Sequence, residues 1–265
     1  MNFSAANHAL RRSLIVAATT ATAMLISLPA VADLVDTVSR IKPSVVAVGT
    51  FQRTRAPAFK FLGTGFAVGD GMMIATNAHV VPDALADDQM ETLAVAVPGE
   101  RQTTVRRVSK LAVDKNHDLA VLRLEGGPPL PSLSIDESSD SVREGQSIAL
   151  TGFPIGSVLG LSPVTHRGIV AAITPIGIPQ LRAQHLNQAL IRRLSNDPFR
   201  IYQLDATTYP GNSGSPVFDS ETGRLIGVIN MVFVKSTKEN ILSDPSGISY
   251  AIPVEYLKAL LKGLE

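Results

Sequence analysis

The chain has 265 residues, of which 45% are apolar, and a formal net charge of +1. A chain of this size and apolar content can bury a core in one domain or in two fused barrels. The balanced charge gives no basic excess that would suggest a nucleic-acid partner, and the absence of cysteine excludes a disulfide scaffold.

The first 32 residues are predicted to be a secretory signal peptide. Arg11 and Arg12 precede an apolar run over Leu14–Leu28, and Ala-Val-Ala at 30–32 is a small-x-small cleavage signature. The run is too short and too rich in Ala and Thr to predict a stable membrane span. Cleavage would leave 22 basic and 23 acidic residues. We expect an exported protein, and the lack of cysteine favours a bacterial periplasmic or secreted one.

After a short amphipathic segment over Leu34–Ile41, apolar β-type runs alternate with turn residues. Short strands without long helices between them predict an all-β barrel or sandwich. The Pro/Ser-rich stretch Gly126–Ser141 divides the strands into two groups and is interpreted as a linker. The predicted strands are Val45–Phe51, Gly65–Val68, Met72–Thr76, Thr92–Val97, Thr103–Val108, Leu119–Leu124, Ile148–Phe153, Val164–Ile173, Ile201–Leu204, Leu225–Val234 and Ile248–Ile252.

Two later segments depart from this β pattern. Apolar residues at helical spacing predict a terminal helix over Val254–Leu264. The segment 174–199 is interpreted as a helical insertion, because Leu186, Leu190 and Leu194 recur at helical spacing. We interpret it as a surface helix docked on the second group of strands, with a regulatory role as the alternative.

The most informative motif is Gly-Asn-Ser-Gly-Ser-Pro at 211–216, which places Ser213 on a tight turn. Its glycines allow the backbone to approach a substrate carbonyl, but this composition is also ordinary for loops. All five histidines precede Ser213, which excludes the α/β-hydrolase order and leaves a His–Asp–Ser order open. A subtilisin-like order using Asp36 or Asp70 would require alternating strands and helices, which the pattern lacks.

A base and an acid in that order come from two strand ends. His79 follows an apolar strand directly, and Asp118 opens the strand 119–124, where a partly buried carboxylate needs a partner. Alone, each could be a capping or turn residue. Together they predict a triad in which His79 accepts the proton of Ser213 and Asp118 orients the imidazole. The backbone N–H groups of Gly211 and Ser213 are predicted to hold the oxyanion.

In this order, the motifs resemble the bacterial HtrA/Deg serine proteases of the trypsin-like superfamily. The resemblance implies two six-stranded antiparallel β-barrels (chymotrypsin-like) with the active site between them. It also implies ATP-independent endoproteolysis of protein or peptide substrates, unfolded ones included. The protease domain is then 33–265, with barrels at about 42–128 and about 143–253. The matching segments are Gly63–Phe66, Thr76–Val81, Asp118–Leu122, Gly168–Val170, Asp205–Ala206, Pro210–Gly214, Gly247–Ile248 and Ala251–Pro253.

Several features depart from that family or leave its properties open. Members commonly carry PDZ domains after the protease, but this chain ends at Glu265, so we expect no peptide sensing by a PDZ. Members often form trimers, and the sequence leaves open whether this chain does. Asn212 stands where digestive zymogens have an aspartate, so activation by a newly cut N-terminus is not expected. The alternative function is a latent protease-fold binding or chaperone-like protein, whose oxyanion loop the 174–199 insertion holds in an inactive shape.

Specificity is predicted from weaker signals. The pocket floor near Thr207 has no acid, and the far wall at 229–232 is largely apolar, which favours small or medium aliphatic side chains. His117, His166 and His185 show no metal-ligand spacing, so we expect neither metal nor cofactor. The predicted pocket residues are Thr207, Thr208, Ile229, Asn230 and Met231.

Overall fold

The fold was analysed in a computed structural model. The predicted signal peptide, Met231 and nearly all of the 174–199 insertion lie outside the residues that it describes. Among the described residues, no helix is both long and apolar enough to cross a membrane. The structure describes residues 33–86, 90–99, 102–135, 142–156, 160–175, 199–230 and 247–264.

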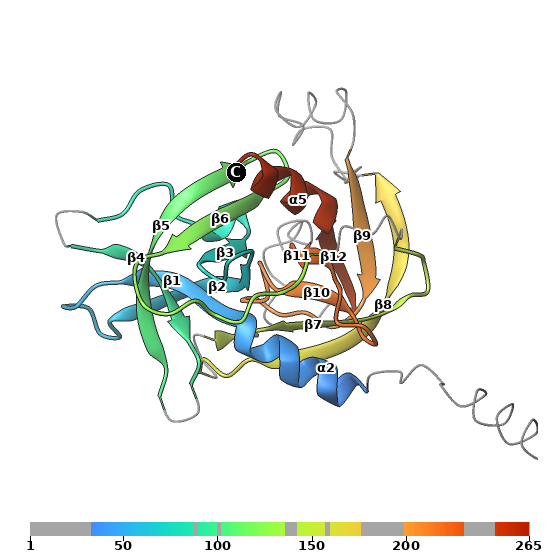
Figure 1. Ribbon diagram of the computed structural model, residues 1–265, viewed down its shortest axis with the longest axis horizontal. Helices are drawn as coiled ribbons and strands as arrows, with labels where there is room; N and C mark the ends of the chain where they lie inside the picture. Colours follow the sequence, from blue (N-terminus) through green and yellow to red (C-terminus); the bar gives the residue numbers. More distant parts are fainter. Residues whose placement is uncertain are drawn as a thin grey trace, which may run out of the picture. The chain divides into compact units, whose positions relative to one another are not determined.

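The first six strands close into an antiparallel barrel in the order β1-β2-β3-β6-β5-β4 (Figure 1). Its interior is filled by an apolar cluster that includes Val46, Val48, Ile74, Val95 and Leu122. The strands are β1 (Val45–Phe51), β2 (Phe59–Val68), β3 (Met73–Thr76), β4 (Thr92–Val97), β5 (Thr104–Asp114) and β6 (Leu119–Leu124).

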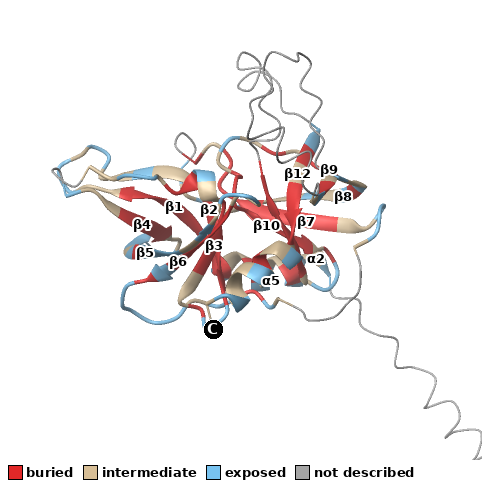
Figure 2. Cartoon of the chain, turned by 90° about the horizontal axis from the view of Figure 1, so that it is seen from above, coloured by how far each residue is buried: buried red, intermediate tan, exposed pale blue. Residues whose placement is uncertain are grey.

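The last six strands close into a second antiparallel barrel in the order β10-β11-β12-β9-β8-β7. The prediction of two six-stranded barrels is therefore confirmed, and Figure 2 shows burial running along the strands of both. Strand β10 was not predicted from the sequence, because its four residues are too few to show an alternating pattern. The strands are β7 (Ser147–Gly152), β8 (Val164–Pro175), β9 (Arg200–Asp205), β10 (Pro216–Asp219), β11 (Leu225–Ile229) and β12 (Ile248–Pro253).

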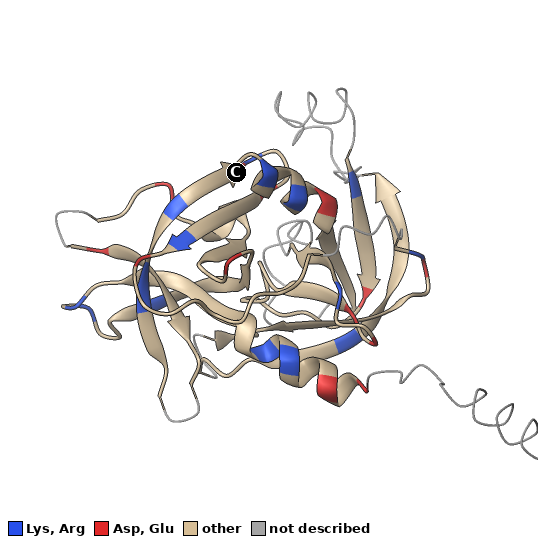
Figure 3. Ribbon diagram, viewed as in Figure 1, with Lys and Arg blue, Asp and Glu red and all other residues tan. Residues whose placement is uncertain are grey.

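Among the described residues, two α-helices flank the barrels, α2 (Leu34–Ile41) before the first and α5 (Val254–Lys262) after the second. The Asp33 side chain caps α2 by accepting from the N–H of Val35 at 3.5 Å. Each helix has an acidic residue in its first turn and a basic residue in its last, as the helix dipole favours (Figure 3). The terminal helix predicted from apolar spacing is thus present.

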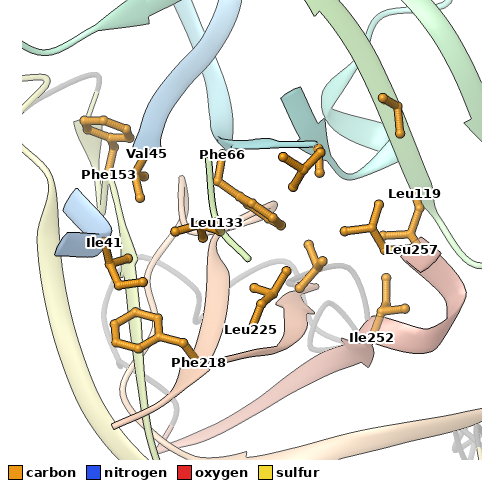
Figure 4. Packing of buried hydrophobic residues seen from close by; sticks show 14 of the residues in the cluster. Ile41, Val45, Phe66, Leu119, Leu133, Phe153, Phe218, Leu225, Ile252 and Leu257 are labelled. Carbon is orange, nitrogen blue, oxygen red and sulfur yellow. The ribbon is translucent and has the colours of Figure 1, made fainter. Parts of the chain in front are cut away.

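One apolar cluster joins the two barrels (Figure 4). Phe66 from β2 and Leu119 from β6 pack in the same cluster as Phe218 from β10 and Ile252 from β12, and Leu257 of α5 completes it. Fully burying a side chain of this size stabilises the fold by about 1.5–3 kcal/mol. The barrels are therefore docked through a continuous hydrophobic seam, and polar residues along that seam are held in fixed positions.

Candidate active site

The structure brings His79 and Asp118 together at the seam. The Nδ1 atom of His79 lies 2.6 Å from Oδ2 of Asp118, and its backbone N–H donates to Oδ1 at 2.9 Å. An ionised carboxylate can only accept, so the proton of a neutral His79 ring resides on Nδ1 and Nε2 keeps a free lone pair. The imidazole therefore has the tautomer that a general base toward a hydroxyl requires.

A left-handed turn aims the Asp118 carboxylate at His79. Asp118 has a φ of +53°, a conformation that aspartate tolerates better than most residues. The Asp118 carbonyl accepts from the side chain of Asn77 at 3.1 Å and from the N–H of Ala78 at 3.1 Å. These bonds tie the turn to the 3₁₀ segment η2 (Ala78–Val80) that carries the histidine. The geometry of the pair is thus fixed by backbone as well as by side chains.

A residue from the second barrel also holds the Asp118 carboxylate. The side-chain amide of Asn230, which follows β11, donates to Oδ2 of Asp118 at 2.6 Å, and Asn230 is fully buried. Sequence reasoning assigned Asn230 to the specificity pocket, and no sequence signal indicated this partner. Oδ2 therefore receives donors from both barrels, and the carboxylate is kept from rotating away from His79.

Ser213 lies in the turn between β9 and β10, beside the His79 segment. A Cβ added to Gly214 would lie 2.5 Å from the hydroxyl oxygen of Thr76. A Cβ added to Gly63 would lie 2.7 Å from Val80 and 3.0 Å from the Ser213 carbonyl oxygen. Both positions require glycine because the two barrels approach so closely there. The Ser213 turn and the His79 segment thus both lie against Gly63 of β2.

Thr64 of β2 holds two carbonyl groups of this turn. Its hydroxyl donates to the Gly211 carbonyl at 2.7 Å, and its backbone N–H donates to the Ser213 carbonyl at 2.8 Å. Thr64 is fully buried. The carbonyls on both sides of Asn212 are thereby anchored to the first barrel.

The other two carbonyls of the turn also have donors. The carbonyl of Pro210 accepts from the N–H of Ile155 at 2.7 Å, and that of Asn212 accepts from the N–H of Ser215 at 2.9 Å. Buried backbone groups in folded proteins are nearly always paired, so this part of the turn is ordinary. The N–H groups of the turn, in contrast, are not all paired within the described residues.

Within the part of the chain that the structure describes, the N–H groups of Gly211 and Ser213 donate to no protein group, whereas that of Asn212 donates to Tyr209 at 3.0 Å. In a trans peptide the N–H points opposite to the carbonyl that precedes it. The Gly211 N–H therefore points away from Ile155. Two unpaired donors on one tight turn have the arrangement that could hold a negatively charged oxygen.

The other predicted pocket residues do not share one environment. The hydroxyl of Thr208 lies 2.8 Å from that of Ser249, inside the second barrel. Ile229 packs in the core of that barrel, and its carbonyl accepts from the N–H of Gly214 at 3.0 Å. Thr207 is half-buried. Ile229 thus supports the nucleophile turn directly.

A second histidine–carboxylate pair lies next to the first in the sequence. Nδ1 of His117 is 2.5 Å from Oδ2 of Asp114. Partial burial acts to raise the pKa of Asp114, but hydrogen bonds from the side chain and backbone of His117 outweigh it and lower the pKa overall. The His117 ring stacks on Tyr256 of α5 at a centroid distance of 4.2 Å and meets the edge of Phe199 at 4.9 Å.

The chain was compared with known proteins. Residues 63–228 match the trypsin-like peptidase domain. A probable periplasmic serine endoprotease, DegP-like, of Halomonas elongata is 30% identical over 195 residues, which cover 73% of this chain and 33% of that protein. The mitochondrial serine protease HTRA2 of Bos taurus is 31% identical over 204 residues, covering 75% of this chain and 35% of that protein. The chain thus spans about a third of the length of these curated relatives.

Solved structures agree on the fold. An HtrA-type protease, AlgW, with a tripeptide superposes with a TM-score of 0.60, covering 88% of this chain and 64% of that one. At 24% identity this similarity bears on the fold alone. The family match spans both barrels and both halves of the seam. The chain therefore belongs to the trypsin-like peptidase family and is an HtrA-like member of it.

Proposed function

We propose that the protein is a serine endopeptidase that cleaves peptide bonds through His79, Asp118 and Ser213 and an acyl-enzyme. The observation that carries this proposal is the hydrogen-bond pattern of the Ser213 turn. All four carbonyls over 210–213 are paired, while the N–H groups of Gly211 and Ser213 are unpaired within the described residues. Two such donors beside the Ser213 side chain are what a site for the substrate's negatively charged oxygen requires.

The chemistry follows from these positions. Asp118 holds the Nδ1 proton of His79, so Nε2 accepts the proton of the Ser213 hydroxyl as its oxygen bonds to the substrate carbonyl carbon. The carbonyl oxygen becomes negatively charged and is held by the two free N–H groups, each worth about 3–4 kcal/mol in such sites. The protonated imidazole then gives its proton to the leaving amine. Water, deprotonated by His79, releases the acyl group and regenerates the serine.

We further propose that the protein acts outside the cytoplasm, on proteins or peptides. The signal-like segment 1–32 supports export, and a DegP-like relative carries the word periplasmic in its name. The floor of the specificity pocket near Thr207 lacks an acid, so we expect cleavage after small or medium aliphatic residues.

The test compares the mature chain with Ser213→Ala on an unfolded protein substrate and with a fluorophosphonate probe. We expect cleavage and labelling by the wild type, and a kcat about 10⁶-fold lower, together with no labelling, for the variant. Cleavage by both proteins would contradict the proposal by assigning the activity to another residue or a contaminant. A folded wild type that neither cleaves nor reacts with the probe would contradict it in favour of a latent or binding protein.

A further inference from the structure

We infer that the hydroxyl of Thr64 is a positioning group for the oxyanion site. This inference rests on the proposed function. Thr64 contributes nothing to the reacting atoms, and it stands in the other barrel from Ser213. Its side chain nonetheless determines how the Gly211 carbonyl is oriented.

Among the described residues, the Thr64 hydroxyl has a single acceptor for its proton, the Gly211 carbonyl. The N–H of Phe153 donates to this oxygen at 3.1 Å, and the oxygen lies 2.7 Å from the carbonyl oxygen of Gly211. An amide N–H can only donate and a carbonyl can only accept, so the hydroxyl must give its proton to Gly211. The hydroxyl therefore links the N–H of Phe153, just after β7, to the Gly211 carbonyl of the Ser213 turn.

The same segment contacts the turn a second time. Two residues after Phe153, the N–H of Ile155 donates to the Pro210 carbonyl at 2.7 Å. The peptides on both sides of the Gly211 Cα are thus fixed, one by Ile155 directly and the other through Thr64. Gly211 has a φ of +103°, and glycine rotates more freely than other residues. Without the Thr64 hydroxyl, the second peptide would keep only the bond from the Asn212 N–H to the Tyr209 carbonyl, beside the residue whose N–H must meet the substrate oxygen.

The Thr64 backbone is also held by a hydrogen bond within the first barrel. Its carbonyl accepts from the hydroxyl of Thr76 at 2.7 Å, and Thr76 lies three residues before His79. One buried chain of hydrogen bonds therefore connects the strand that leads to the base, β2, and the turn that carries the nucleophile. Small displacements of reacting groups can cost about 100-fold in rate, so this link is positioned to affect the chemical step.

Thr64→Val and Thr64→Ser separate the hydroxyl from the shape of the side chain. Valine keeps the branched shape without the hydroxyl, and serine keeps the hydroxyl without the methyl group. We expect Thr64→Val to slow fluorophosphonate labelling and kcat about 10- to 100-fold, with KM within about threefold. We expect Thr64→Ser to label within about threefold of the wild type.

Thr50→Val is the matched control. Thr50 is also a buried threonine of the first barrel, and its hydroxyl donates to Glu91 at 2.5 Å, away from the turn. All proteins are assayed at a temperature where circular dichroism shows each to be folded. Equal labelling of Thr64→Val and the wild type would overturn the inference, as would equal slowing by Thr64→Ser or by Thr50→Val. An inactive wild type would instead count against the proposed function, so the two failures are distinguishable.

Discussion

Two histidine–carboxylate pairs lie side by side in this sequence, and they are nearly identical as pairs. Nδ1 of His79 lies 2.6 Å from Asp118, and Nδ1 of His117 lies 2.5 Å from Asp114. The two histidine side chains are 29% and 28% exposed. Distance and burial alone would therefore give both pairs the same role.

Their surroundings separate them. The carboxylate of Asp118 also receives the amide of Asn230 from the second barrel, and the His79 segment faces the Ser213 turn. The His117 ring is instead covered by Tyr256 and Phe199, two aromatic residues of the C-terminal half. One pair lies on a segment close to the Ser213 turn, and the other is stacked on Tyr256 and met by the edge of Phe199. The comparison teaches that a histidine–aspartate pair becomes a catalytic candidate only through what the free ring nitrogen can reach.

Replacing each histidine in turn tests this contrast most strongly. We expect His79→Ala to lower kcat about 10⁵- to 10⁶-fold, because no other group accepts the serine proton. We expect His117→Ala to keep activity within about tenfold but to destabilise the fold by about 1–3 kcal/mol, because it removes two ring contacts and a hydrogen bond. Peptide hydrolysis and urea unfolding measure the two effects. A similar loss of kcat in both variants would contradict the distinction.

Removing the extra donor on Asp118 sharpens the contrast further. We expect Asn230→Ala to lower kcat about tenfold with little change in KM, because a hydrogen bond to a charged group contributes about 1.5–3 kcal/mol. The matched control is Gln146→Ala, which removes an amide that donates to Asp219 at 2.8 Å elsewhere in the same barrel. Steady-state kinetics of both variants are the measurement. Equal kcat values for the two variants would show that Asn230 has no special link to the site.

The acid response of the Asp114 pair is the smallest expected effect. A carboxyl with a pKa lowered by folding stabilises the native state above its unfolded pKa, about 3.9 for Asp, and loses this effect as the pH falls through the folded value. Asp114→Asn should therefore destabilise the protein near neutral pH, by an amount that shrinks below about pH 4. Urea unfolding across this range measures it.

The control for that experiment is Asp83→Asn. Asp83 pairs with Lys115 at 3.1 Å, but its side chain is 89% exposed, so we expect little change at any pH. A constant destabilisation by Asp114→Asn down to low pH would contradict the assignment of the shifted pKa.

The sequence was sufficient for those features that local pattern controls. Strand runs divided by a Pro/Ser-rich stretch predicted two groups of β-strands, which the two barrels confirm. The assignment of base, acid and nucleophile from motif order stays a prediction, of which the structure shows the His79–Asp118 pair. The donors that complete the site could not be found in this way. Asn230 is 112 residues from Asp118, and Thr64 is 147 residues from Gly211. Such pairs are created by docking of the barrels, and neither residue carries a local signal of its partner.

For the predicted pocket residues, too, the sequence did not determine where the side chains point. Asn230 was expected to line the specificity pocket, as part of the segment 229–232 interpreted as its far wall. Its side-chain amide donates to Asp118, and its place in the pocket stays a prediction. Successive side chains of a strand point to opposite faces of the sheet. A position predicted to within one residue therefore does not determine which face its side chain lies on.

The anchoring of the Ser213 turn by Thr64 also bears on when a newly made chain becomes able to cleave. Neither barrel alone contains both the turn and the two donors that Thr64 supplies to it. The contact spans more than half of the polypeptide, and closing so long a loop is entropically costly and slows folding. A partly folded or truncated chain would thus carry Ser213 without the two hydrogen bonds from Thr64 that hold its turn. If the chain cleaves as proposed, we expect it to do so only after both barrels have docked.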